Sequence, residues 1–161
     1  MLQKYSVMNG RIVQGDEGSI QVEVYIMPDE AERSKLINEY EMNEHTIASS
    51  IDPDETPRIE FEDNHTAFIL KYPKNYSADD NFLFRVKSMG IFVFAARVVI
   101  IIDEYVPLFT GKIANNVHPV QAVIMKTLLL TIRHFESHLR VINMCSDELE
   151  HAIVSSYDGK E

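Results

Sequence analysis

The longest segment free of glycine and proline lies between Pro119 and Gly159, and it constrains the fold more than any other part of the chain. Within it, apolar residues recur every three or four positions, which indicates one face of an α-helix and approaches coiled-coil spacing. This apolar stripe consists of Leu128, Ile132, Phe135, Leu139, Ile142, Cys145, Leu149 and Ile153. At 1.5 Å per residue the helix reaches ~50 Å, longer than one domain of this size covers. We therefore expect the stripe to pack on another helix, on another chain, or on a part of the protein outside this sequence.

The first half of the chain predicts a strand followed by two short helices. Residues 19–27 place Ile20, Val22, Val24 and Ile26 at alternate positions, as in a half-buried strand. Pro28 and the acidic residues after it are typical of the first turn of a helix, so we predict a helix from Pro28 to about residue 40. A second short helix is predicted over residues 43–51, ending before Pro53.

From residue 58 the pattern changes to strands. We predict strands over residues 58–62, 66–72, 82–86 and 91–95, with Gly90 as a bulge or bend between the last two. Residues 98–102 are five consecutive β-branched residues, which predict a central strand buried on both faces. The expected fold class is α/β: a mixed, largely antiparallel sheet flanked by short helices, with a long C-terminal, stalk-like helix. Residues 1–117 would form the α/β domain, and residues 118–161 the helix packed on it.

Charge and composition narrow the possible partners. The formal net charge of −10 argues against nucleic acid and anionic lipid, and it favours cationic partners such as metal ions alongside a solvated acidic surface. No N-terminal targeting signal is visible, and no stretch approaches the ~20 apolar residues that cross a bilayer. Cys145 is the single cysteine, which we expect to be a small core residue in a reducing compartment. We expect the chain as given to be soluble.

Residues with catalytic or ligand potential form no enzyme motif. There is no nucleophile elbow and no glycine-rich phosphate loop, so we expect neither enzymatic activity nor an organic cofactor. His134 and His138 share one helix face and, with His151, are candidate transition-metal ligands. They lack the glutamate directly after the first histidine that zinc proteases require. The acidic pairs Asp79-Asp80 and Asp103-Glu104 are interpreted as solvated turns.

Residues 52–63 read Asp-Pro-Asp-Glu-Thr-Pro-Arg-Ile-Glu-Phe-Glu-Asp. Several of these residues have a local structural use. Pro53 ends a helix, Asp52 accepts hydrogen bonds from nearby backbone, and Arg58 and Glu60 pair because alternate residues of a strand share a face. We therefore expect structural roles for Asp52, Pro53, Pro57, Arg58 and Glu60.

This stretch, followed by a strand ending in Lys71-Tyr72-Pro73, resembles the Asp-Pro-x-x-x-Pro-Arg-Ile-Glu signature of CorA-type divalent-cation transporters. Residues 98–102 with Val106-Pro107-Leu108-Phe109 are similar to the last strands of that family's cytoplasmic domain, and Asp147-Glu148-Leu149-Glu150 to its stalk helix. The resemblance implies an N-terminal funnel domain on the cytoplasmic face of the inner membrane. The parent would be a homopentamer for Mg²⁺, Co²⁺ or another divalent cation. The family's Gly-Met-Asn motif and transmembrane helices are not in this sequence, so we expect this part alone to be a monomer or weak oligomer.

The resemblance has one gap at the position of a regulatory metal ion. The best-known family members carry a Glu-Asp pair whose aspartate helps to hold this ion between subunits, and this chain has Ala48 and Ser49 there. A serine hydroxyl is a poor ligand for Mg²⁺. Asp52, Asp54 and Glu55 remain as candidate ligands, exposed acids that would leave Mg²⁺ largely hydrated. The alternative function is a stand-alone soluble α/β metal-binding or protein-interaction module.

Overall fold

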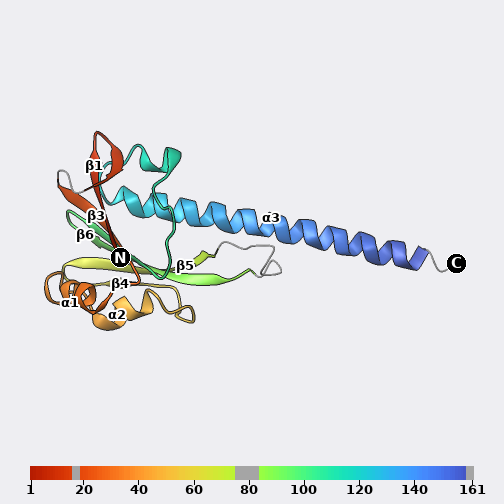
Figure 1. Cartoon of the computed structure of the whole chain (residues 1–161), viewed down its shortest axis with the longest axis horizontal. Coiled ribbons are helices and arrows are strands. Elements are labelled where there is room, and N and C mark those ends of the chain that lie inside the picture. Colours follow the sequence, from red (N-terminus) through yellow and green to blue (C-terminus); the bar gives the residue numbers. More distant parts are fainter. Residues whose placement is uncertain (16–18, 75–83, 159–161) are drawn as a thin grey trace.

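The computed structural model describes residues 1–15, 19–74 and 84–158. In this part of the chain a seven-stranded sheet has the order β2-β1-β3-β7-β6-β5-β4, in which only β3 and β7 are parallel. The strands are β1 (Leu2–Met8), β2 (Arg11–Gln14), β3 (Ile20–Ile26), β4 (Arg58–Phe61), β5 (His65–Pro73), β6 (Val86–Phe94) and β7 (Val98–Ile102). Helices α1 (Glu30–Asn38) and α2 (Glu44–Ser49) lie on one face of the sheet, and α3 (Ala122–Asp158) begins on the other (Figure 1). The predicted fold class is confirmed.

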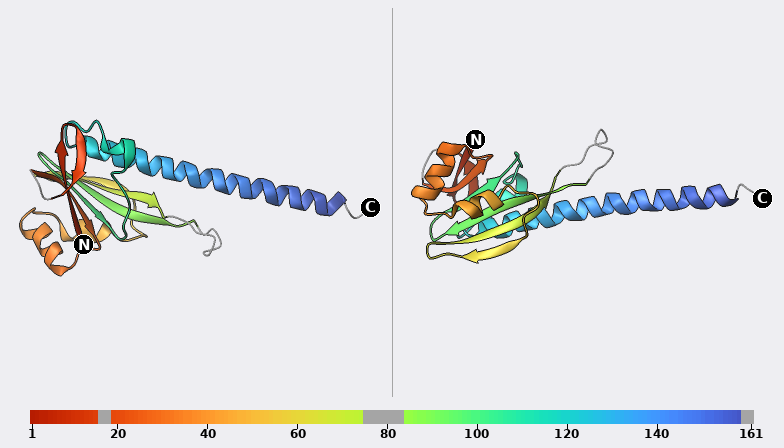
Figure 2. Two further views of the ribbon diagram at one scale, coloured as in Figure 1. Left: turned by 45° about the horizontal axis from the view of Figure 1, so that its top comes forward. Right: turned by 90° about the horizontal axis from the view of Figure 1, so that it is seen from below.

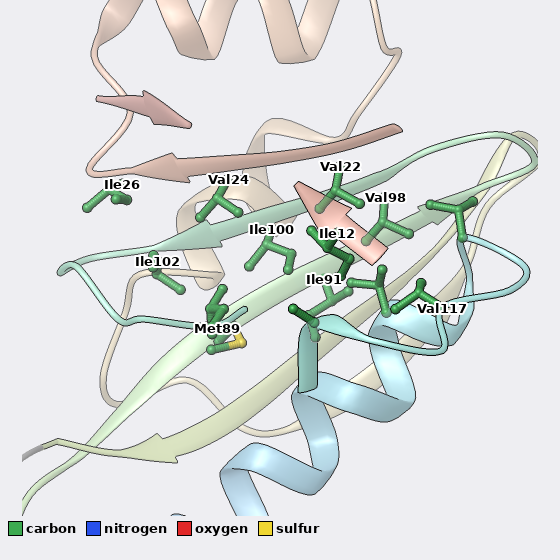
Figure 3. Close-up of a cluster of buried hydrophobic side chains, with 14 of the residues drawn as sticks. Ile12, Val22, Val24, Ile26, Met89, Ile91, Val98, Ile100, Ile102 and Val117 are labelled. Atoms are coloured by element: carbon green, nitrogen blue, oxygen red, sulfur yellow. The ribbon is translucent and has the colours of Figure 1, made fainter. Parts of the chain in front are cut away.

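Strand β7 is the centre of two cores. All five of its residues are 0% exposed, as the run of β-branched residues predicts. Val98, Ile100 and Ile102 join the core beneath α3, which Figure 3 shows together with residues of β2, β3 and β6. Val99 and Ile101 face the other way, into the core beneath α1 and α2. A strand buried on both faces requires apolar residues at every position.

The N-terminal hairpin of β1 and β2 was not predicted from the sequence. Polar and apolar residues do not alternate clearly in β1, because Leu2–Met8 mixes polar and aromatic residues without a period of two. The turn itself carries a signal, since Asn9 and Gly10 both have positive φ angles, 49° and 74°. Asn-Gly between two strands is the typical sequence of such a tight turn.

Gly90 does not form a bulge, and the two strands predicted around it are one strand, β6. Its register with β5 and β7 runs unbroken, Gly90 lying opposite Ile69 and Ile101. A Cβ atom at Gly90 would lie 2.0 Å from the hydroxyl oxygen of Ser50, at the end of α2. The glycine therefore allows α2 to approach the sheet closely. Residues 82–83 of the prediction lie outside the described residues.

Helix α1 begins two residues later than predicted. Pro28 precedes the N-cap, which is Asp29. The Asp29 side chain accepts a hydrogen bond from the backbone N–H of Glu32 at 2.8 Å, and Glu32 accepts one from the backbone N–H of Asp29 at 3.1 Å. This reciprocal capping box fixes the start of the helix at Glu30.

Helix α3 contacts the sheet through a face different from the apolar stripe. Val123 and Thr127 are 0% exposed and His138 is 5% exposed, whereas Leu139 and Leu149 of the stripe are 58% and 65% exposed. The helix then runs past the end of the sheet (Figure 2). Cys145 lies in this outer part and is half-buried, so the prediction of a core cysteine was wrong. Among the described residues, no helix has the length and apolar character needed to cross a membrane.

Candidate functional site

The Asp-Pro segment joins the end of α2 to the start of β4, at one corner of the sheet. Asn43 caps α2 by accepting a hydrogen bond from the backbone N–H of His45 at 2.8 Å. Thr46 and Ser49 are three residues apart, so they lie on the same helix face. Both are buried, at 3% and 2% exposure; Thr46 turns toward Glu60 on β4, and Ser49 turns toward Glu55 in the loop.

Arg58 is the centre of a network that closes this corner. Its guanidinium lies 2.8 Å from Glu55 and 2.6 Å from Glu60, and it donates to the Ser49 hydroxyl at 3.1 Å. Ser49 in turn donates to Glu55 at 2.7 Å, and Thr46 donates to Glu60 at 2.8 Å. The pairing of Arg58 with Glu60, predicted from strand alternation, is confirmed. The Arg58 guanidinium thereby links the end of α2, the loop and β4.

The network lowers the pKa of both glutamates. The hydrogen bond from Ser49 is the main cause of the lowered pKa of Glu55, and Arg58 adds to it. The hydrogen bond from Arg58 is the main cause for Glu60, with Thr46 contributing. The two carboxylates together raise the pKa of Arg58. All three groups are therefore charged at neutral pH.

Two side chains from the sheet hold the backbone of the loop. Lys71 on β5 donates to the carbonyl oxygen of Pro53 at 2.6 Å and to the hydroxyl of Ser88 at 2.9 Å. Ser88 on β6, which is 1% exposed, donates to the carbonyl oxygen of Asp52. The carbonyl groups around Pro53 are therefore satisfied by protein donors, which fixes the path of the loop.

The structure separates the roles of the three candidate metal ligands. Glu55 is held by Arg58, Ser49 and the backbone N–H of Thr56. Asp52 accepts a hydrogen bond from the backbone N–H of Asp54 at 2.9 Å, as expected for a turn, and both aspartates are exposed. In the described ranges, no three His, Cys, Asp or Glu side chains are grouped closely enough to hold a metal ion.

The candidate histidines of α3 and the acidic pair Asp103-Glu104 lie away from the Asp-Pro corner. The rings of His134 and His138 are 4.6 Å apart between centroids, and desolvation lowers the pKa of both. His151 is exposed and lies 13 residues farther along the helix, ~20 Å away at 1.5 Å per residue, so it does not join them. Asp103 and Glu104 are not merely solvated, because Lys87 contacts both, at 2.5 and 3.2 Å. Asp79-Asp80 lies outside the described residues.

Four residues of the corner were not identified from the sequence as partners in it: Thr46, Ser49, Lys71 and Ser88. The spacing of Thr46 and Ser49 is visible in the sequence, but it does not show which strand the helix face meets. Ser88 is separated from Asp52 by 36 residues, so its contact depends on the pairing of β5 with β6. Ser49, considered from the sequence as a replaced metal ligand, is a buried hydrogen-bonding residue.

The fold of this chain was compared with those of known proteins. No protein-family model matches the sequence, and no curated protein sequence matches it significantly. The soluble domain of CorA from Methanocaldococcus jannaschii matches 96% of this chain with a TM-score of 0.69 and 17% identity. The complete CorA magnesium transporter from the same organism also matches 96%, with a TM-score of 0.69 and 15% identity. The chain spans 65% of the first and 51% of the second. The resemblance that the Asp-Pro segment predicted is confirmed at the level of the fold, which this chain shares with the CorA soluble domain.

Proposed function

We propose that this chain is the cytoplasmic domain of a CorA-like divalent-cation transporter. The observation that carries the proposal is the fold similarity over 96% of the chain, in a sequence that also contains the Asp-Pro-x-x-x-Pro-Arg-Ile-Glu segment. The proposed role is conformational and involves no catalysis.

In this proposal the parent protein is a homopentamer anchored in the inner membrane by helices outside this sequence, and it transports Mg²⁺ or Co²⁺. The exposed apolar stripe of α3 supports an assembled parent. Ile132, Leu139 and Leu149 are each more than half exposed, on a helix that extends beyond the sheet. Such a surface is costly to leave in water, and it is typical of a contact with another element.

The acidic charge supplies the proposed regulation. Subunits that each carry a formal charge of −10 repel one another when their faces meet. Divalent cations between those faces offset the repulsion and favour the closed arrangement, provided that they bind it more tightly than the open one. The Arg58 network serves here as a rigid corner, and the exposed Asp52 and Asp54 are the acids it leaves accessible to cations.

A transport assay tests the proposal. The protein encoded by the complete gene is produced in bacteria that lack their own Mg²⁺ transporters, and growth at low Mg²⁺ and uptake of Mg²⁺ and Co²⁺ are measured. We expect rescue by the complete protein and none by residues 1–161 alone. A complete gene product with no pair of apolar segments of ~20 residues, or one that transports neither cation, would favour the stand-alone module.

A further inference from the structure

The outer part of α3, residues 141–156, extends past the sheet and is not covered by it (Figure 2). Every side chain from residue 142 to residue 156 is exposed, apart from the half-buried Cys145. Ile142, Leu149 and Ile153 are 38%, 65% and 57% exposed, so large apolar groups face water here. Together with Cys145 they follow one another by three or four positions and form an outer stripe on one helix face. This spacing is typical of a helix that packs along a second helix.

The charged side chains beside the outer stripe all have the same sign. Asp147, Glu148 and Glu150 are exposed, and residues 141–156 contain neither lysine nor arginine. Successive residues of a helix are rotated by about 100°, so Glu148 and Glu150 lie on either side of Leu149. Among the described residues, no cation forms an ion pair with any of these three carboxylates. The outer stripe is therefore flanked by negative charge that the chain does not compensate.

The basic residues of α3 are confined to its inner part, which lies on the sheet. They are Lys126, Arg133 and Arg140, and all three precede the outer part. Arg140 is already paired with Glu136, one turn back along the helix. Because interactions along a helix reach only three or four residues, these cations cannot serve the carboxylates around Leu149. Positive charge for the outer part must come from another element.

We propose that the outer stripe docks a basic amphipathic helix, whose apolar face covers Leu149 and Ile153 and whose lysine or arginine residues lie beside Glu148 and Glu150. Charged residues that flank an apolar helix seam select the partner helix. The same charges disfavour other occupants. Anionic lipid and nucleic acid are repelled, and a second copy of this chain brings another formal net charge of −10. The inference concerns this surface alone and does not rest on the proposed transport.

Two synthetic peptides provide the test. Both form amphipathic helices with the same leucine seam, and one carries lysine and the other glutamate at the positions that flank it. Binding of each labelled peptide to residues 1–161 is measured by fluorescence anisotropy. We expect the lysine peptide to bind about tenfold more tightly at low salt, because several exposed ion pairs each contribute a little. This advantage should disappear in about 1 M NaCl, where the Debye length is ~3 Å.

Substitutions in the chain separate the stripe from general charge. Glu148→Lys combined with Glu150→Lys should reverse the preference between the two peptides. Glu62→Lys combined with Asp63→Lys is the matched control, because it changes the net charge equally at exposed positions between β4 and β5, and it should leave the lysine peptide preferred. Leu149→Asp should abolish binding of both peptides. Its thermal melt should match that of the parent, since the position is 65% exposed.

One further peptide tests whether the partner must be helical. A lysine peptide with a central proline cannot form one continuous helix, and it should not bind. The proposal is overturned if this peptide binds as tightly as the helical one, or if the control substitutions act as strongly as those at Glu148 and Glu150, because general attraction to an acidic protein would then be sufficient. It is also overturned if the lysine and glutamate peptides bind equally, or if neither binds. A dimer of residues 1–161 that is seen by sedimentation velocity and abolished by Ile153→Asp would assign the stripe to a second copy instead.

Discussion

Replacing Gly90 with alanine tests how α2, which carries Thr46 and Ser49, is seated on the sheet. The added Cβ would lie 2.0 Å from the hydroxyl oxygen of Ser50, 2.6 Å from its Cβ and 2.9 Å from a ring carbon of Phe92. The hydroxyl can rotate, but the Ser50 Cβ is fixed to the backbone at the end of α2, so the helix must move. Because Ser50 is 0% exposed, no free space accommodates that movement.

Two effects of opposite sign contribute to the expected change. Alanine restricts the unfolded chain, which stabilises a protein by about 0.4–1 kcal/mol where the native site accepts it. Overpacking of a filled core costs typically ~1–3 kcal/mol, and contacts this short belong at the upper end. We expect Gly90→Ala to lower the free energy of unfolding by about 2 kcal/mol. For a domain of this size that lowers Tm by roughly 4–8 °C.

Thermal melts and urea titrations of four proteins measure the effect: the parent, Gly90→Ala, Ser50→Gly and the double variant. Ser50→Gly removes the two shortest of the three contacts and leaves the one with Phe92, so the double variant should recover at least ~1 kcal/mol relative to the sum of the single changes. Ser50→Ala is the matched control, because it removes the hydroxyl and keeps the Cβ, and it should rescue only in part. A Gly90→Ala protein as stable as the parent would refute the direct contact between α2 and β6.

Three further outcomes are expected. Leu139→Asp and Ile142→Asp, at positions 58% and 38% exposed, should change the unfolding free energy of this chain by less than ~0.5 kcal/mol. The same two variants should reduce any self-association seen by light scattering. Val123→Asp, at a fully buried position, should lower the unfolding free energy by several kcal/mol in the same melts. Millimolar Mg²⁺ should stabilise residues 1–161 by under ~1 kcal/mol near its Kd, in melts and calorimetry; a micromolar isotherm abolished by Asp52→Asn would instead identify a sensor site. The pKa of Glu60 is lowered from 4.5, mainly by Arg58, so its contribution to stability is complete above about pH 4.5 and is lost as pH falls through the lowered pKa. The loss of stability in Arg58→Gln should therefore shrink as the pH falls below about 4.5, and a loss that is constant with pH would contradict this assignment.

The sequence alone was sufficient wherever the deciding interaction is local. Five β-branched residues in a row fix β7 as a doubly buried strand, because each position of such a strand must be apolar. Arg58 and Glu60 pair because alternate residues of one strand share a face, whatever else surrounds them. The likeness to CorA also depended on short contiguous segments, chiefly residues 52–60, which are readable without the fold.

Only the tertiary structure decided which surfaces meet. Gly90 was interpreted as a break in a strand, because the sequence does not show that Ser50, 40 positions away, approaches its backbone. Helix α3 carries two apolar faces, and its own periodicity cannot rank them; the sheet selects the face of Val123 and Thr127 and leaves the stripe of Leu139 exposed. The same holds for Ser88 and Lys71, whose roles at the Asp-Pro corner exist only because β5 and β6 pair beside it. Local spacing specifies the shape of each element, and the contacts between distant elements follow from packing that no single segment encodes.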